Sequence, residues 1–358
     1  MNWRQSSRWL VYYSDPLAEV AKGDAPKLPM PLTESHIEWI EAQAGNHGVI
    51  MATSRNVAAA LNAKSAIVTG GDENACSVAG TSLADALESS HLAHLRRNMM
   101  LNDVARRISA RLSEESLPAV IVKGPDFADN VYGGLHMRAF SDIDILVNPV
   151  ATEAVEAVIA DLGFAPVAPS SKREAYTERQ FVRQGGDGET HLVELHTDVV
   201  HAPKLRRSMS LTHDDYAGRN SGGVTMAGRL ILAALHGATS HQFDRLQYVV
   251  DMLMIARAGV DAPELKDRAA RAGAETAVLT GLDLAVGLFG CETSAALARQ
   301  LKPRHDNKLA RRLVGPASVV NAQSPSRWLY SWRRQAYRWM LTRQPELVQR
   351  GSSELGAN

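Results

Sequence analysis

Residues 141–147 read Ser-Asp-Ile-Asp-Ile-Leu-Val, and they follow residues 119–124, which read Ala-Val-Ile-Val-Lys-Gly. Each run is apolar over a length typical of a buried strand, and the first ends in a Lys-Gly turn. Because side chains alternate along a strand, Asp142 and Asp144 face one side while the isoleucines face the core. The sequence therefore predicts two carboxylates on one face of a sheet.

These two carboxylates predict a site for a divalent cation. They lie about 7 Å apart along an extended backbone, which lets their oxygens meet at one ion. Oxygen ligands favour Mg2+ or Mn2+, ions that often hold substrate phosphates as well. An Asp-x-Asp pair alone is common by chance. Here the apolar neighbours favour a site, because a carboxylate among them is costly unless it is paired or binds a metal.

A third acid lies in residues 191–196, which read His-Leu-Val-Glu-Leu-His, again an alternating pattern typical of a strand. Residues 185–188 read Gly-Gly-Asp-Gly and predict a hairpin turn just before it. The hairpin can bring Glu194 beside the strand of Asp142, where a third carboxylate would complete a metal site. His196 shares the Glu194 face, and we interpret it as a site residue, with a hydrogen-bonded core histidine as the alternative.

Together these residues resemble the uncharacterised bacterial nucleotidyltransferase family, which belongs to the DNA polymerase beta-like nucleotidyltransferase superfamily. The resemblance covers roughly residues 35–260 and rests on Lys123-Gly124, Tyr132, Arg138, residues 141–147, Glu194-Leu195-His196, Leu235-His236, His241, Leu246 and Asp251. The chain also departs from the superfamily pattern. Its turn is Lys-Gly, where the superfamily usually has Gly-Gly or Gly-Ser, and the connection to Asp142 is longer.

The resemblance implies an α+β fold: the nucleotidyltransferase-fold mixed sheet flanked by helices, with N-terminal helices and a C-terminal helical domain. We expect four parts along the chain. They are an N-terminal arm and helices at residues 1–83, the nucleotidyltransferase catalytic domain at 84–205, the helical domain at 206–345 and a flexible tail at 346–358.

The resemblance also implies a metal-dependent nucleotidyltransferase, which moves an NMP from an NTP such as ATP to an acceptor and releases pyrophosphate. Asp142, Asp144 and Glu194 would be catalytic and would hold Mg2+ or Mn2+, with Glu194 as the candidate base. The nucleotide-binding residues would be Lys123, Gly124, Arg138, Ser141 and His196. For several of these the alternative is a surface or strand-end position without a role. The acceptor stays open between a small molecule, a peptide, a protein and RNA.

Two other functions fit the same residues. Asp-x-Asp also marks Mn2+-dependent glycosyltransferases that use nucleotide sugars, although the Lys-Gly turn before the aspartates and the third acid after them argue against this. The chain could also be a non-catalytic nucleotide- or partner-binding module of the same fold. The presence of all three carboxylates argues against the loss of activity.

Composition agrees with a globular enzyme. The chain has 358 residues, of which 45% are hydrophobic and 22% charged, and its formal net charge is zero. No overall field therefore attracts nucleic acid or a membrane. It has no apolar run of about 20 residues and no secretory pattern at its start. Two cysteines far apart suggest no disulfide framework, and we expect a cytoplasmic protein without a transmembrane segment.

Basic charge is concentrated in residues 301–350, where aromatic side chains lie among the arginines: Trp328, Tyr330, Trp332, Tyr337 and Trp339. This mixture suits an acidic partner at residues 327–343, such as RNA, an acidic protein or an anionic membrane surface. The interpretation that we favour is a terminal amphipathic helix whose tryptophans pack on the body of the protein while its arginines face solvent.

Periodicity predicts helices at residues 36–61 with a break near Gly45 and Gly48, at 82–113, at 152–162 and from 224 to about 345, and a loop over 64–82. His236 and His241 fall within the last helical region. They are five residues apart and so do not share a face of an α-helix. We interpret them as base-stacking or packing residues.

Overall fold

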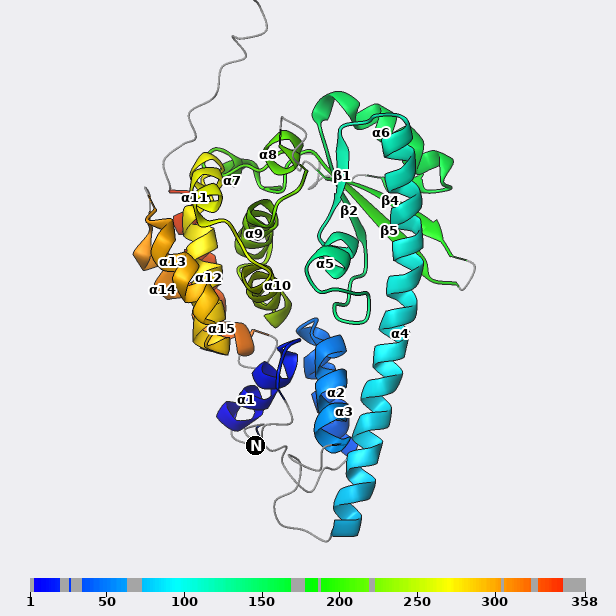
Figure 1. Ribbon diagram of the computed structural model, residues 1–358, viewed down its shortest axis with the longest axis vertical. Coiled ribbons are helices and arrows are strands. Elements are labelled where there is room, and N and C mark those ends of the chain that lie inside the picture. The colour runs from blue at the N-terminus through cyan, green and yellow to red at the C-terminus, as the bar shows by residue number, and fades with distance from the viewer. Residues whose placement is uncertain are drawn as a thin grey trace, which may run out of the picture.

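The computed structural model describes residues 3–19, 26, 34–62, 73–168, 178–185, 188–218, 223–303, 306–322 and 328–343. A five-stranded mixed sheet is flanked by helices, and further helices fill the rest of the molecule (Figure 1). The predicted α+β class is confirmed. The predicted flexible tail at 346–358 lies outside the described residues.

The sheet has the strand order β1-β2-β5-β4-β3. Its strands are β1 (Ala119–Val122), β2 (Ile143–Val147), β3 (Ala165–Pro166), β4 (Glu178–Gln184) and β5 (Thr190–His196). Only the β2–β5 pair is parallel; β1 pairs with β2, β4 with β5 and β3 with β4 in the antiparallel sense. The strand expected at 119–122, the one carrying the aspartates and the hairpin are all confirmed.

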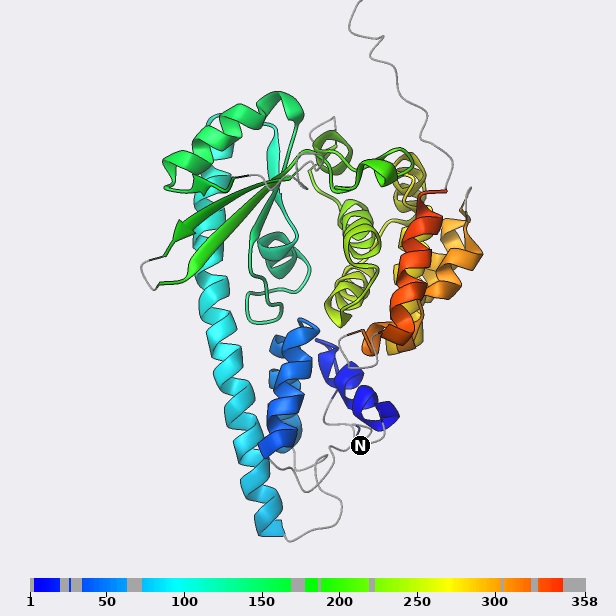
Figure 2. The same cartoon turned by 180° about the vertical axis from the view of Figure 1, so that it is seen from behind.

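The two faces of the sheet have different environments. Ile143 and Ile145 of β2 and Val193 of β5 are buried in a core shared with α4 (Glu73–Glu114) and α6 (Thr152–Asp161). The alternate residues of β2 and β5, which include Asp144 and Glu194, face the other way. That second face lies toward α5 (Gly124–Asn130) and the helical half of the molecule in both views (Figures 1 and 2).

The longest element is α4, a single helix of 42 residues. It runs from the N-terminal helices α2 (Glu34–Asn46) and α3 (Ile50–Asn62) up to the sheet (Figure 2). Helix α2 ends at Asn46 and α3 begins at Ile50, which confirms the expected pair of helices with a break near Gly45 and Gly48. The loop expected over 64–82 is wrong for residues 73–82, which are helical. A glycine such as Gly80 costs a helix only about 1 kcal/mol, so it does not end one.

The remaining helices follow the sheet in the sequence, apart from α1 at the N-terminus and η2 between β2 and α6. They are α1 (Trp3–Ser14), η2 (Pro149–Ala151), α7 (Pro203–Arg206), α8 (His213–Ala217), α9 (Met226–Leu235), η3 (His236–His241), α10 (Leu246–Arg257), α11 (Ala262–Arg271), α12 (Glu275–Phe289), α13 (Glu292–Leu301), α14 (Lys308–Leu313), α15 (Pro316–Val320) and α16 (Trp328–Leu341). Among the described helices, none has the length and apolar character needed to cross a membrane.

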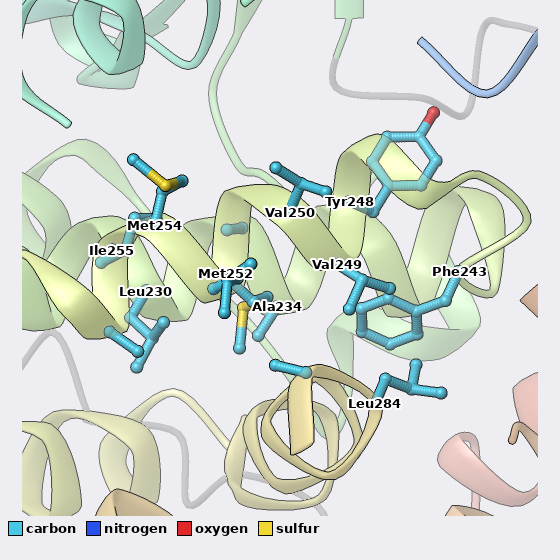
Figure 3. Close-up of a cluster of buried hydrophobic side chains, with 14 of the residues drawn as sticks. Leu230, Ala234, Phe243, Tyr248, Val249, Val250, Met252, Met254, Ile255 and Leu284 are labelled. Atoms are coloured by element: carbon cyan, nitrogen blue, oxygen red, sulfur yellow. The ribbon is translucent and has the colours of Figure 1, made fainter. Parts of the chain in front are cut away.

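Helix α10 forms the centre of the helical half. All its residues from Leu246 to Ala256 are buried, which explains why its sequence is apolar almost all round. Figure 3 shows Val249 and Met252 of this helix among other buried side chains. These are Leu230 of α9, Leu284 of α12 and Phe243, which precedes α10. This packing holds α10 firmly, so the residues that α10 presents to the sheet have fixed positions.

Helix α16 buries one side and exposes the other. Tyr337 and Leu341 are fully buried, whereas Trp328, Trp332 and Trp339 are 69%, 62% and 57% exposed. The interpretation that these tryptophans pack on the body is wrong. Their spacing of four and seven residues places them on one side of the helix, opposite the two buried residues.

Candidate active site

Asp144 and Glu194 lie directly opposite each other on the parallel strands β2 and β5. Both residues alternate with buried apolar neighbours, so their carboxylates share the face directed away from α4. Asp144 is only 3% exposed. The expected proximity of the third acid to the aspartate strand is confirmed by this register.

Lys123 follows β1 and reaches the same point. Its Nζ lies 2.6 Å from Oδ1 of Asp144. Burial disfavours the ammonium, but Asp144 and Asp142 outweigh it and raise the pKa of Lys123. Burial alone would likewise disfavour the carboxylate of Asp144, yet Lys123 and His196 hold the pKa of Asp144 well below its usual range. The pair is therefore charged on both sides.

The backbone of Lys123 has φ 54° and ψ −122°. A positive φ is strained for any residue with a Cβ atom and is favoured by glycine. Lys123 thus adopts a glycine-like turn, and this turn places its ammonium at Asp144. Strain of this kind is found mainly at functional sites.

Gly124 lies against the residue that precedes β2. A Cβ atom on Gly124 would come within 3.3 Å of the carbonyl oxygen of Asp142 and within 3.2 Å of the Phe140 ring. Such contacts are tighter than side chains normally make, so glycine allows the turn to approach Asp142 closely. Ser141 is exposed, and its hydroxyl lies 3.4 Å from Oδ2 of Asp142.

Asp142 is less tightly held than Asp144. Burial and the charge of Asp144 raise the pKa of Asp142. Among the described residues, Asp144, Glu194 and His196 bring ligand atoms within 4.8 Å of one another, and this group does not include Asp142. The structure thus brings two of the three predicted metal ligands together with His196, and places Asp142 at the edge of the group.

Glu194 is a second acid of this face with a strongly shifted pKa, in the opposite direction to Asp144. It accepts a hydrogen bond of 2.7 Å from Nε2 of Gln180. Burial, followed by the negative charges of Asp144 and Glu178, raises the pKa of Glu194 to about 7. More negative charge is gathered here than Lys123 neutralises, and an added cation would relieve the excess.

His196 connects the acids. Its Nε2 lies 2.9 Å from Oδ1 of Asp144 and 3.7 Å from Oε2 of Glu194. Because an ionised carboxylate only accepts hydrogen bonds, this Nε2 donates to Asp144. His196 therefore lies inside the group of acids, as predicted, and orients Asp144 whatever else it binds.

Arg138 lies in a different network. Its Nε and Nη2 donate to the two carboxylate oxygens of Asp251, at 2.7 and 2.9 Å. Tyr132 and Gln247 donate to the same carboxylate at 2.7 and 2.9 Å. Of the residues that carry the family resemblance, three thus join the end of α5 to α10. Asp251 is thus a hydrogen-bonded structural acid, and it engages two nitrogens of Arg138.

His236 and His241 lie close together, in contrast to the expectation from their spacing in the sequence. They bound η3, a π-helical turn with a wider winding than an α-helix, in which residues five apart lie on the same side. Their ring centroids are 4.9 Å apart, and His241 stacks on Tyr248 at 4.6 Å. The expectation that they share no helix face is wrong, because it assumed α-helical winding.

Three further residues at this face were not identified from the sequence. Glu178 and Gln180 alternate on β4 and lie opposite His196 and Glu194 in the register. His201 lies five residues beyond His196, with ring centroids 4.9 Å apart. The alternation on β4 was available as a signal, but the fold of the segment after β5 was not.

Comparison with known proteins gives one family. The model of a family described as an uncharacterised nucleotidyltransferase matches residues 67–290, which is more than half of the chain. No curated protein and no solved structure gives a significant match. The matched region contains the sheet, α5, η3 and α10, and hence every residue of the site described above.

Proposed function

Since the chain belongs to the uncharacterised nucleotidyltransferase family, we propose that it transfers a nucleotidyl group from an NTP to an acceptor and releases pyrophosphate. The observation that carries this proposal is the pairing of Asp144 with Glu194 on adjacent strands, with Asp142 beside them and Lys123 at their centre. We further propose that the chain shares its ancestry with the DNA polymerase beta-like superfamily.

The residues of this face fit a divalent cation. Asp144 and Glu194 offer oxygen ligands within 4.8 Å of each other, and burial, followed by the negative charges of Asp144 and Glu178, raises the pKa of Glu194. We propose that Asp142, Asp144 and Glu194 hold Mg2+ or Mn2+. When bound, such ions stabilise negative charge on the transferring phosphate and its leaving group.

The chain's own groups have separate tasks in this proposal. Glu194 accepts the proton of the acceptor hydroxyl, as a carboxylate within reach of that proton can. Lys123 offers its ammonium to the phosphates, and the Gly124 turn and Ser141 lie next to Asp142, where the nucleotide would enter. His196 holds Asp144 in place. Arg138 contributes mainly through Asp251, which fixes the segment before Ser141 against α10.

The acceptor stays open between a small molecule, a peptide, a protein and RNA. The preferred base of the NTP also stays open. An acidic partner at α16 is part of the proposal, because three tryptophans are exposed there among Arg333, Arg338 and Arg343. A cytoplasmic location remains a prediction from composition.

Nucleotide binding separates this proposal from its alternatives. Calorimetry with ATP, GTP, CTP and UTP should show binding that requires Mg2+ and that is lost in Asp142→Ala/Asp144→Ala. Binding without any turnover in the presence of cell extract would favour the non-catalytic module. Turnover of UDP-sugars in place of NTPs would favour the glycosyltransferase, and no binding of any nucleotide would contradict the proposal.

A further inference from the structure

Beside the proposed active site lies a second group of potential ligands: Glu178 on β4, His196 on β5 and His201 beyond it. Each offers one ligand atom, and these atoms lie within 4.8 Å of one another. Glu178 and His196 are direct partners in the antiparallel register, so the sheet itself fixes their distance. His201 completes the group from the loop that leaves β5, with its Nδ1 3.8 Å from Oε2 of Glu178.

Only one of the two ring nitrogens of His196 makes a hydrogen bond to a described residue. Nε2 donates to Asp144, so in the neutral ring Nδ1 carries a lone pair. This Nδ1 is buried and has no hydrogen-bond partner among the described residues. A carboxylate that holds one nitrogen of a histidine while the other faces a metal is the usual support of a metal-binding histidine.

His201 shows the same lack of a partner. Its Nδ1 is also buried without a hydrogen bond from any residue that the structure describes. In the neutral ring, the nitrogen without a proton offers its lone pair to a metal ion. Two buried imidazole nitrogens without partners, close to a carboxylate, are costly unless something binds them.

We propose that Glu178, His196 and His201 bind a transition-metal ion, with Zn2+ the best fit, at a site separate from the one proposed for Mg2+. Two imidazoles and one carboxylate are a ligand set that suits Zn2+ and its neighbours, whereas Mg2+ prefers oxygen ligands alone. A fourth ligand position stays open to water or substrate.

An ion bound at this position would affect the neighbouring proposed active site in two ways. It would be linked to Asp144 through His196, and it would offset the negative charge of Glu178. Gln180 also connects the two sites, since its Nε2 donates to Glu178 and to Glu194 at 2.7 Å each.

Zn2+ binding to the untagged, metal-stripped full chain tests this site, and the test needs no nucleotide. Calorimetry in excess Mg2+ should show one Zn2+ per chain, and Co2+ should give the visible absorption of a four-coordinate site. His201→Gln and Glu178→Gln should each weaken Zn2+ binding by at least about 100-fold. His201→Cys, which restores a ligand for zinc, should recover much of it.

Two control variants locate the ion, and a separate measurement reports on folding. His136→Gln changes an exposed histidine and should leave Zn2+ binding unchanged, as should Asp142→Ala. Circular dichroism of each variant shows whether it is folded. Zn2+ binding that His201→Gln leaves intact, that Asp142→Ala abolishes, or that the wild type lacks would overturn the proposal. None of these results bears on NTP binding, so the proposed function stands or falls separately.

Discussion

Nζ of Lys123 lies 2.6 Å from Oδ1 of Asp144, so the chain itself places a cation on the carboxylate at the centre of its proposed metal site. The contact depends on a glycine-like backbone at Lys123 and on the end of β1 lying opposite Asp144 in the register. A bound metal ion must share Asp144 with this ammonium or displace it toward the phosphates of the nucleotide. The Lys-Gly turn thus places an ammonium at Asp144 and, at Gly124, lets the backbone approach Asp142 closely.

Lys123→Met should make the protein more dependent on divalent cations for its stability. Without Lys123 the buried Asp144 loses its closest cation, and breaking a buried ion pair costs about 3 kcal/mol in the free energy of unfolding. Added Mg2+ should restore more of this stability in the variant than it adds to the wild type. Urea unfolding with EDTA and with Mg2+ measures both quantities.

Lys266→Met serves as the control for this comparison, because Lys266 is exposed on α11. It should be as stable as the wild type under both conditions. An equal response to Mg2+ in Lys123→Met and the wild type would show that the ammonium and the metal do not share Asp144.

Glu194→Gln should remove part of the pH dependence of stability in metal-free buffer. The pKa of Glu194 is raised from 4.5 to about 7, so between these values the folded chain binds more protons here than the unfolded chain. The free energy of unfolding therefore falls as pH rises through this window. The cost above pH 7 is about 3 kcal/mol, at 1.36 kcal/mol per pKa unit.

Urea unfolding of Glu194→Gln and wild type between pH 4.5 and 8 tests this, since other groups cancel in the difference. The variant should gain stability relative to the wild type as pH rises. Glu153→Gln, on the exposed side of α6, should follow the wild-type curve. A constant difference between Glu194→Gln and wild type would mean that Glu194 titrates normally.

Asp251→Asn should destabilise the chain by about 3 kcal/mol, because it leaves the buried guanidinium of Arg138 without its carboxylate. Arg138→Met should also destabilise the chain, because it leaves the buried carboxylate of Asp251 without its guanidinium. The double variant Arg138→Met/Asp251→Asn should recover most of these losses, since it removes both charges. Chemical denaturation gives the coupling free energy. If the two single losses simply add in the double variant, Arg138 has a partner other than Asp251.

Substitutions on α16 should separate its two sides. Trp332→Ala should change the free energy of unfolding by less than about 0.5 kcal/mol, as is usual for exposed positions. Tyr337→Ala should cost about 3 kcal/mol or more, because Tyr337 is fully buried and its hydroxyl bonds to Thr280 at 3.2 Å. A large loss in Trp332→Ala would contradict the exposed tryptophan face.

The sequence was sufficient for the elements whose pattern is local. The apolar runs of β1 and β2 and the alternation of β5 predicted strands, and the glycines between β4 and β5 predicted their hairpin. From these, the meeting of Glu194 with the aspartate strand followed. The family resemblance added the order of the parts, and the match over residues 67–290 confirms the family.

Contacts between distant segments could not be read in this way. Nothing local shows that Arg138 pairs with Asp251, which is 113 residues away, or that Lys123 reaches Asp144. The π-helical winding of η3 was not predicted, because sequence patterns are interpreted with α-helical spacing. On α16, the tryptophans were expected to pack on the body, and only the tertiary contacts show that Tyr337 is buried while Trp332 is exposed.

Transfer of label from α-labelled NTPs tests the central claim most directly. The pure protein is incubated with Mg2+ or Mn2+, each labelled NTP and cell extract, next to Asp142→Ala/Asp144→Ala and the control Asp103→Asn, an exposed acid on α4. We predict that α-label, but not γ-label, appears on an acceptor with wild type and control. The double variant should lose at least about 100-fold of this rate, or 2.7 kcal/mol. Label transfer that is unchanged in the double variant, or none with any nucleotide, would contradict a nucleotidyltransferase site at Asp142, Asp144 and Glu194.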